Sequence, residues 1–206
     1  MFKKIDFPKI QPIIAKKKAE PFDDPEWSFE FKYDGFRAVM YLADGKGFIK
    51  SRNGKILSRF DPLCQEIARE LKVKNVIFDG EVVTLDETNR PIFEDLVKNT
   101  RKPVYIAFDI LWLEGQDLRS LSLSERRKYL KKVLPKKSEV VLKPLISKGH
   151  GKKFFELLCA HDLEGIVGKK ESDPYEHYVT WYKIKNKNYS QLNDIRKNFN
   201  FKKSNI

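Results

Sequence analysis

The chain has 206 residues, of which 41% are hydrophobic and 13% aromatic, enough to enclose a core of its own. Its formal net charge of +12 favours a polyanionic partner such as a nucleic acid. The sequence contains no long apolar run, no CxxC pair and no zinc-ligand spacing. We therefore expect no membrane span, no disulfide framework and no zinc site.

The first periodic pattern in the chain follows a segment rich in Pro and Lys. Residues 1–28 predict an extended arm, because prolines favour extended backbone in the residues that precede them. Over residues 29–33 apolar and polar side chains alternate, which predicts a strand with Glu30 and Lys32 on one face and aromatic side chains on the other. A half-buried lysine beside carboxylates can be an activated amine, although most single lysines are solvated.

Turn residues divide the next segment into short strands. Asp44-Gly45 and Asn53-Gly54 both favour tight hairpins, so residues 29–58 predict a small antiparallel meander. Asp61-Pro62 then has the form of a helix start, with Asp as the N-cap and Pro in the first turn. The apolar spacing that follows predicts a helix over 62–72.

Strands and helices alternate along the remainder of the chain. The expected strands are 76–83, 104–113, 140–142, 164–170 and 181–185, and the expected helices are 93–98, 122–133 and 152–161. Nothing marks an internal linker, so we expect one α+β domain over residues 29–188. A basic tail over 189–206 follows, in which Leu192, Ile195 and Phe199 have the spacing of one helix.

Several charged residues fall on strands that should otherwise be buried. They are Glu30, Lys32, Asp79, Glu81, Asp109, Glu164, Lys183 and Lys185. A structural ion pair can explain any one of them, but a whole set indicates a ligand, because buried charges are costly unless paired or bound. Carboxylates hold Mg²⁺ and lysines neutralise phosphate, and no GxxxxGK[ST] loop is present. The residues therefore predict a nucleotide or phosphoryl-transfer enzyme that acts on nucleic acid.

Six motifs in this chain resemble those of the covalent nucleotidyltransferases, which include ATP-dependent DNA ligases, RNA ligases and mRNA capping enzymes. The first is Lys32-Tyr33-Asp34-Gly35-Phe36-Arg37, which resembles KxDGxR. The others follow in the family's order: Ser51-Arg52-Asn53-Gly54, Asp79-Gly80-Glu81, Phe108-Asp109-Ile110-Leu111, Glu164-Gly165-Ile166-Val167 and Trp181-Tyr182-Lys183-Ile184-Lys185. One such motif is weak evidence, whereas six ordered motifs are specific. The leading residues, 12–30, look most like DNA ligases of bacteria and archaea, in particular the ligase domain of bacterial end-joining ligases.

The resemblance implies an α+β nucleotidyltransferase domain, ATP-grasp-like, with antiparallel sheets flanked by helices. It implies that Lys32 attacks the α-phosphorus of ATP and forms a lysine–AMP intermediate. Lys183 and Lys185 would lower the pKa of that amine and neutralise the phosphate. Glu81 and Glu164 would hold Mg²⁺ or Mn²⁺.

The same resemblance assigns the residues that bind the rest of the nucleotide. Phe108 would stack on the adenine base, and Glu30 would accept a hydrogen bond from the adenine amino group. Arg37 and Arg52 suit contacts to ribose or phosphate. Strand alternation puts Lys170, and not Lys169, on the face of Glu164 unless a bulge at Gly168 changes this, so both lysines stay candidates for nucleic-acid contacts.

A complete ligase of this family continues into an OB-fold domain of roughly a hundred residues, and too few residues follow Lys185 to form one. We therefore expect the nucleotidyltransferase domain alone, either as a piece of a longer protein or as a natural minimal ligase. Without the domain that clamps pyrophosphate, adenylation should be slow, whereas sealing of pre-adenylated nicks should survive.

The expected partner is nicked double-stranded DNA, with a separate OB-fold or repair protein as a further candidate. We expect a monomer in the cytoplasm, associated with the nucleoid and not with a membrane. Two alternative functions stay open from the sequence. One is an RNA ligase with the same chemistry, and the other is a nucleic-acid-binding module with weak or no turnover.

Overall fold

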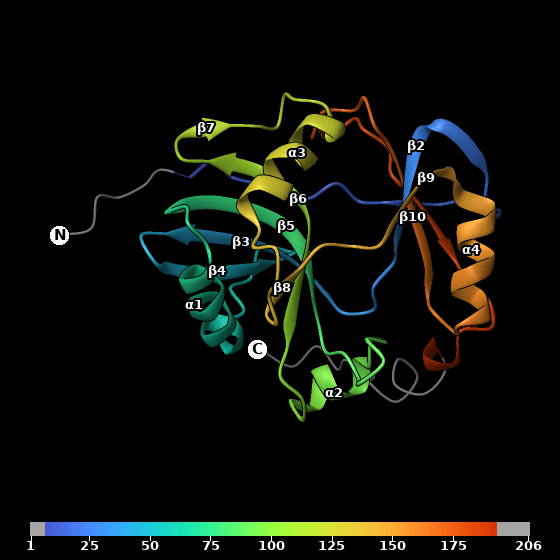
Figure 1. Cartoon of the computed structure of the whole chain (residues 1–206), viewed down its shortest axis with the longest axis horizontal. Coiled ribbons are helices and arrows are strands. Elements are labelled where there is room, and N and C mark those ends of the chain that lie inside the picture. The colour runs from blue at the N-terminus through green and yellow to red at the C-terminus, as the bar shows by residue number, and fades with distance from the viewer. Residues whose placement is uncertain (1–6, 193–206) are drawn as a thin grey trace.

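Two β-sheets form the described part of the chain, residues 7–192 of the computed structural model (Figure 1). The five-stranded sheet has the order β1-β11-β10-β2-β9. Its strands are β1 (Lys16–Lys17), β11 (Tyr182–Lys185), β10 (Gly165–Lys170), β2 (Asp23–Phe31) and β9 (Ile146–His150). The other sheet has the order β4-β3-β5-β6-β7, with β8 beside β6. Its strands are β4 (Lys46–Ser51), β3 (Phe36–Ala43), β5 (Asn75–Val83), β6 (Val104–Leu113), β7 (Gln116–Asp117) and β8 (Val141–Leu142).

Helices cover the outer faces of the two sheets. They are α1 (Asp61–Glu70), α2 (Phe93–Lys98), α3 (Leu123–Val133) and α4 (Gly151–Ala160), with short 3-10 turns at Ser58–Phe60 and Ser190–Leu192. Helices α1 and α3 pack against the six-stranded sheet, and α4 packs against the five-stranded sheet (Figure 1). The α+β class and the predicted antiparallel sheets flanked by helices are confirmed. Helix 93–98 and strand 104–113 begin and end where the sequence predicts.

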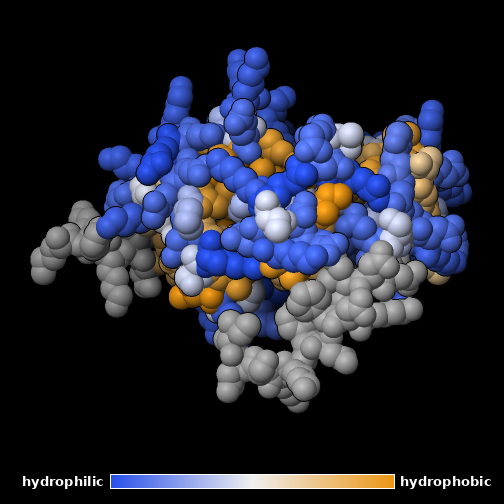
Figure 2. Space-filling view, turned by 90° about the horizontal axis from the view of Figure 1, so that it is seen from below, coloured by the Kyte–Doolittle hydropathy of each residue, from blue (hydrophilic) through white to orange (hydrophobic). Residues whose placement is uncertain are grey.

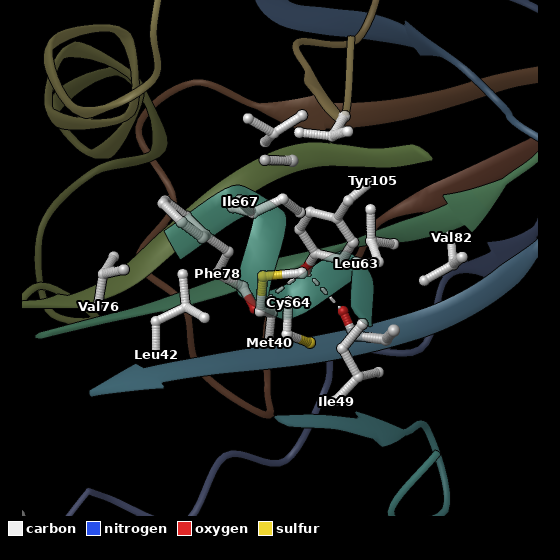
Figure 3. Packing of buried hydrophobic residues seen from close by; sticks show 14 of the residues in the cluster. Met40, Leu42, Ile49, Leu63, Cys64, Ile67, Val76, Phe78, Val82 and Tyr105 are labelled. Carbon is white, nitrogen blue, oxygen red and sulfur yellow. Dashed lines mark hydrogen bonds between the residues drawn. The ribbon is translucent and has the colours of Figure 1, made fainter. Parts of the chain in front are cut away.

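The largest hydrophobic core lies between the six-stranded sheet and its helices (Figure 3). Cys64 and Ile67 of α1 are fully buried there against the sheet. The Tyr105 hydroxyl, buried in the same core, donates to the carbonyl oxygens of Ala38 at 2.8 Å and Phe78 at 3.2 Å. Its polar atom therefore ties neighbouring strands together instead of being left unsatisfied.

Alternation along β2 and β11 gives the five-stranded sheet two different faces. Phe29, Phe31 and Ile184 pack in the hydrophobic cluster under α4. Glu30 and Lys183 lie on the opposite face, which looks toward the six-stranded sheet. The alternation predicted for these strands is confirmed, and it places one face of charged residues between the two sheets.

The predicted meander over residues 29–58 is wrong. The β3–β4 hairpin forms with Asp44 and Gly45 at positive φ, as predicted for its tight turn. However, β2 belongs to the other sheet, and the chain crosses between the sheets over residues 32–35. The crossing needs glycine at position 35, because a Cβ there would lie 2.1 Å from the carbonyl oxygen of Val82.

Two local predictions also differ from the structure. Asp61 is not an N-cap, because the preceding 3-10 turn continues directly into α1 and the N-cap is Phe60 without a side-chain bond. The arm predicted over residues 1–28 contributes β1 and the first part of β2 to the five-stranded sheet. The predicted tail helix with Ile195 and Phe199 lies outside the described residues. The domain boundaries stay predictions.

The surface facing the viewer in Figure 2 is mostly hydrophilic, with only scattered hydrophobic groups. This agrees with the high share of charged residues, 34% of the chain. Within residues 7–192, none of the helices has the length and hydropathy that crossing a membrane requires.

Asp109, one of the charges on a predicted core strand, is part of a structural ion pair. Both its oxygens accept from the Arg126 guanidinium, at 2.8 and 2.9 Å, and both side chains are at most 1% exposed. Asp109→Ala should lower the free energy of unfolding by about 3–5 kcal/mol, because it leaves the Arg126 charge buried and unpaired. Urea denaturation measures this loss.

The exposed ion pair between Glu94 and Lys98 provides the control. Glu94→Ala should leave the urea midpoint almost unchanged, since solvent screens such pairs. The double variant Asp109→Ala/Arg126→Met should regain part of the loss. If the double variant is less stable than Asp109→Ala alone, the unpaired guanidinium is not the cause of the destabilisation.

Candidate active site

A cavity of about 410 Å³ lies between the two sheets, within the range of small-molecule sites. Its lining combines the face of the five-stranded sheet that carries Glu30 with the facing strands of the six-stranded sheet. The predicted site residues that line it are Glu30, Lys32, Arg37, Arg52, Glu81, Phe108 and Lys183. Glu164 and Lys185 are not part of the lining, but both are joined to Lys32 through ion pairs. The structure therefore brings all nine predicted residues together.

Lys32 lies just after β2, where its backbone N–H donates to the carbonyl of Gly165 at 2.9 Å. Its Nζ donates to Glu164 Oε2 at 2.6 Å, and Lys185 Nζ donates to the other oxygen of Glu164 at 2.8 Å. Burial by itself would raise the pKa of Glu164, but the charges and hydrogen bonds of the two lysines outweigh it and lower that pKa. Glu164 is thus an ionised carboxylate that fixes two amines at the cavity.

Positive charge collects at one end of the cavity. Lys183 and Arg52 line it, and Lys32 and Lys185 lie next to them. Burial and the repulsion of these neighbours lower the pKa of Lys183. A cluster of this kind is stabilised by an anion, and a phosphate chain is the anion that a cluster of lysines and an arginine suits.

Glu81 projects into the same cavity from β5. Burial is the main reason that its pKa is raised to about 7, and the carboxylates of Glu164 and Asp34 add to the rise while Lys32 and Arg37 oppose it. A carboxylate in these surroundings is stabilised by added positive charge, so it is suited to bind a divalent cation. Among residues 7–192, no three His, Cys, Asp or Glu side chains are arranged so that they could hold a metal ion by themselves. An ion held by Glu81 and Glu164 would complete its shell with water and ligand phosphate oxygens, as Mg²⁺ commonly does.

Asp79 holds the Arg37 side chain in place at the cavity lining. The guanidinium donates to both Asp79 oxygens, at 2.7 and 2.5 Å, and the Tyr175 hydroxyl donates to the same carboxylate at 2.6 Å. Arg37 also lies 4.7 Å from the centre of the Phe108 ring. Asp79 is fully buried and both its oxygens are paired in this network, so it orients Arg37.

The other end of the cavity is aromatic. Phe108 is the extra residue of a β-bulge, since Asp79 pairs with Asp109 and Gly80 pairs with Ala107. A bulge re-aims a side chain, and here it leaves Phe108 on the cavity lining, 9% exposed. Trp181 lines the cavity beside it, with ring centres 6.1 Å apart.

Lys169 lies at a position that the strand alternation did not predict. It is not a surface contact for nucleic acid: it is buried, lines the cavity, and lies 4.1 Å from the Phe108 ring centre and 4.0 Å from that of Trp181. Its Nζ lies 2.6 Å from Glu30 Oε2. Burial lowers the pKa of Lys169, although Glu30 opposes this.

The error has a local cause at Gly165. Glu164 lies just before β10, and the φ of +134° at Gly165 breaks the alternation between them, so Glu164 contacts Lys32 and Lys185 while Lys169 lines the cavity. Lys170 instead points outward and pairs with Glu26 at 3.1 Å. The Glu164-Gly165 dipeptide is the signal in the sequence that could have corrected the register.

Comparisons with known proteins agree with this site. Residues 10–185 match the family described as "ATP dependent DNA ligase domain", so the chain belongs to that family and is a DNA ligase domain. Multifunctional non-homologous end joining protein LigD of Mycolicibacterium smegmatis is 33% identical over 165 residues, which cover 79% of this chain and 21% of LigD. SPbeta prophage-derived DNA ligase-like protein LigB of Bacillus subtilis is 28% identical over 195 residues, 89% of this chain and 70% of LigB.

A solved structure supports the same assignment. The structure titled "mycobacterial DNA ligase D complexed with ATP and MES" superposes with a TM-score of 0.74 at 26% identity, and covers 84% of this chain and 59% of that chain. The chain thus spans about a fifth of the LigD protein above and just over half of this ligase structure. The resemblance to the ligase domain of bacterial end-joining ligases is confirmed.

The raised pKa of Glu81 predicts how stability depends on pH. The folded protein favours the protonated carboxyl of Glu81. The stabilisation that comes from this preference is complete below the usual pKa of 4.5 and is lost as pH rises through about 7. As pH rises from 5 to 8, the free energy of unfolding should therefore fall less in Glu81→Gln than in the wild type. Urea denaturation across this range measures the difference. Glu156→Gln, at an exposed site on α4, is the control and should parallel the wild type, and a parallel curve for Glu81→Gln would contradict the prediction.

Proposed function

We propose that this domain seals nicks in double-stranded DNA through a covalent lysine–AMP at Lys32. The Lys32 nitrogen attacks the α-phosphorus of ATP, the bond to pyrophosphate breaks, and the amine gives up its proton. An oxygen of the DNA 5′-phosphate then attacks the same phosphorus and releases Lys32. Finally the 3′-hydroxyl attacks the 5′-phosphorus, so that the strand is joined and AMP leaves. The observation that carries the proposal is the position of Lys32, at the cationic end of a nucleotide-sized cavity.

Lys183 and Lys185 would stabilise the negative charge that develops on the phosphate. In the resting arrangement Lys32 donates to Glu164, so the amine must leave this ion pair before its lone pair can attack. Glu81 and Glu164 are suited to hold Mg²⁺ or Mn²⁺. A bound divalent ion would supply further charge neutralisation at the phosphates.

The aromatic end of the cavity supports adenine as the base. Phe108 offers a ring for stacking. Glu30 offers a hydrogen-bond acceptor beside the Lys169 ammonium, which is a donor. Adenine presents the complementary pair, an amino donor next to a ring-nitrogen acceptor. Guanine presents the reverse order on its corresponding edge, so this pair of side chains favours ATP over GTP.

Incubation with α-labelled ATP and Mg²⁺ tests the first step. The wild type should acquire label that survives denaturation and is released by mild acid, as expected of a phosphoramidate. Lys32→Ala should acquire none, because no other amine lies in its place. Lys148→Ala, at an exposed lysine of β9, is the matched control and should label normally. Persistent label on Lys32→Ala would disprove the assignment of the nucleophile.

We further propose that the 206-residue chain, assayed alone, seals pre-adenylated DNA nicks faster than ordinary nicks. The support is that both sheets of residues 7–192 belong to the nucleotide-binding layers, and neither supplies the family's separate OB-fold barrel. Lys32→Ala should retain sealing of pre-adenylated nicks and lose sealing of ordinary nicks with ATP. Single-turnover rates on the two substrates measure both effects, and equal wild-type rates would contradict the proposal.

The relatives named above are a non-homologous end joining protein and a DNA ligase-like protein, which favours DNA over RNA as the nucleic acid. Parallel assays on DNA and RNA nicks decide between these substrates. A monomeric state, a separate OB-fold or repair protein as partner, and a place on the nucleoid remain part of the proposal.

A further inference from the structure

Glu30 is held by two cations that come from different parts of the fold. Its Oε2 lies 2.6 Å from Lys169 Nζ, and its Oε1 accepts from Arg127 Nη2 at 2.6 Å. Glu30 and Lys169 line the cavity, whereas Arg127 does not. Arg127 therefore contacts Glu30 from outside the cavity. No step of the proposed function uses it.

Arg127 is itself held rigidly. It lies on α3, and the backbone N–H groups of Leu123 and Ser124 in the first turn of this helix donate to the carbonyls of Asp173 and Glu171. The neighbouring Arg126 is locked to Asp109 in the core. The helix thus has little freedom to move relative to the loop that follows β10.

The guanidinium of Arg127 spans three acceptors on the five-stranded sheet and its loop. Beside Glu30 it donates to the Ser28 hydroxyl at 2.7 Å and to the Glu171 carboxylate. Its side chain is 15% exposed, and that of Glu30 is 3% exposed. The planar guanidinium reaches this set from two separate nitrogens, Nη1 and Nη2, whereas an ammonium has a single nitrogen.

We propose that Arg127 is a positioning residue that holds the Glu30 carboxylate in place as a hydrogen-bond acceptor for the base, and so sets the selection of ATP over GTP. This inference rests on the proposed function, because it concerns the base of the same nucleotide. Arg127 does not touch the nucleotide; it acts through Glu30.

The chemistry of the two bases explains why the cation matters. An ionised Glu30 can only accept, so it suits the amino group of adenine and repels the carbonyl oxygen of guanine. Without Arg127, Glu30 and Glu171 would share a buried region with Lys169 as the remaining close cation. Glu30 would then lose the contact that orients it and turn away from the base, so its acceptor would no longer oppose the carbonyl oxygen of guanine. Loss of Arg127 therefore weakens ATP binding and relaxes the exclusion of GTP.

The test compares Arg127→Gln, Arg127→Lys and Lys128→Gln as full-length chains. Lys128 is the next residue of α3 and is exposed, so its substitution removes the same charge without touching Glu30. The measurements are the KM and kcat of self-adenylation with ATP and with GTP, and the Kd of each nucleotide from quenching of tryptophan fluorescence. Thermal unfolding reports whether each variant is folded.

In Arg127→Gln the KM for ATP should rise about tenfold, as expected for losing one charge-assisted hydrogen bond. Its kcat at saturating ATP should stay within about threefold, because Arg127 does not contact the reacting atoms. The ratio of kcat/KM for ATP to that for GTP should fall at least about fivefold. Arg127→Lys should be intermediate, and Lys128→Gln should match the wild type.

Three results would overturn the inference. They are an unchanged ATP-to-GTP ratio in Arg127→Gln, equal losses for both nucleotides, and the same effect in Lys128→Gln. The Kd values separate this inference from the proposed function. A wild type that binds ATP but acquires no covalent label would refute the lysine–AMP chemistry, and the Kd ratio of the variants would still decide the role of Arg127. A wild type that binds neither nucleotide refutes both.

Discussion

The neutralisation of charge between the two sheets is the constraint on which the site depends. A carboxylate that is 1% exposed, Glu164, persists as an ion because Lys32 and Lys185 each hold one of its oxygens. Moving a charge from water into the protein interior costs several kcal/mol. The three charged side chains are therefore stable there only when they pair with one another. The same pairing delivers two amines to one end of the cavity. The arrangement that neutralises the buried Glu164 therefore also places two amines where the proposed reaction needs them.

The other charges between the sheets divide into satisfied and unsatisfied groups. Asp109 with Arg126 and Asp79 with Arg37 are closed pairs whose role is to hold the fold and orient a guanidinium. Glu81 has its pKa raised to about 7 and forms no such pair in the structure. Perturbed groups of this kind mark functional sites, because a ligand, and not the protein, completes their electrostatics. This contrast distinguishes Glu81 from a structural ion pair such as Asp109 with Arg126, although the two carboxylates look alike in the sequence.

Local patterns predicted the site well wherever a strand keeps its alternation. The faces of Glu30 and Lys183 follow from a period of two residues, and the capping box at Ser122 starts α3 as predicted. The register of Lys169 was missed, because the positive φ of Gly165 is a property of one residue that periodicity does not record. The motif order, which reflects family resemblance and not spacing, supplied the set of nine site residues.

Long-range features could not be predicted in the same way. Nothing local in residues 32–35 indicates that the chain passes from one sheet to the other, because that depends on where β5 and β10 lie. Similarly, Arg126 and Arg127 are adjacent basic residues on a helix, and both read as solvated. One is buried against Asp109 and the other reaches Glu30 across 97 positions of sequence. Tertiary partners alone give these residues their roles.

One pair of adjacent strands, β2 and β10, carries or adjoins the charged residues at both ends of the cavity. Glu30 comes from β2, and Lys32 directly follows that strand. Glu164 directly precedes β10 and Lys169 lies near its end, and β10 pairs antiparallel to β2. A slip of one residue in this pairing would turn Glu30 toward α4 and its hydrophobic cluster. The buried ion pairs across the two strands penalise such a slip at both ends. The charges proposed to recognise the nucleotide therefore also fix the strand register that places Lys32 at the cavity.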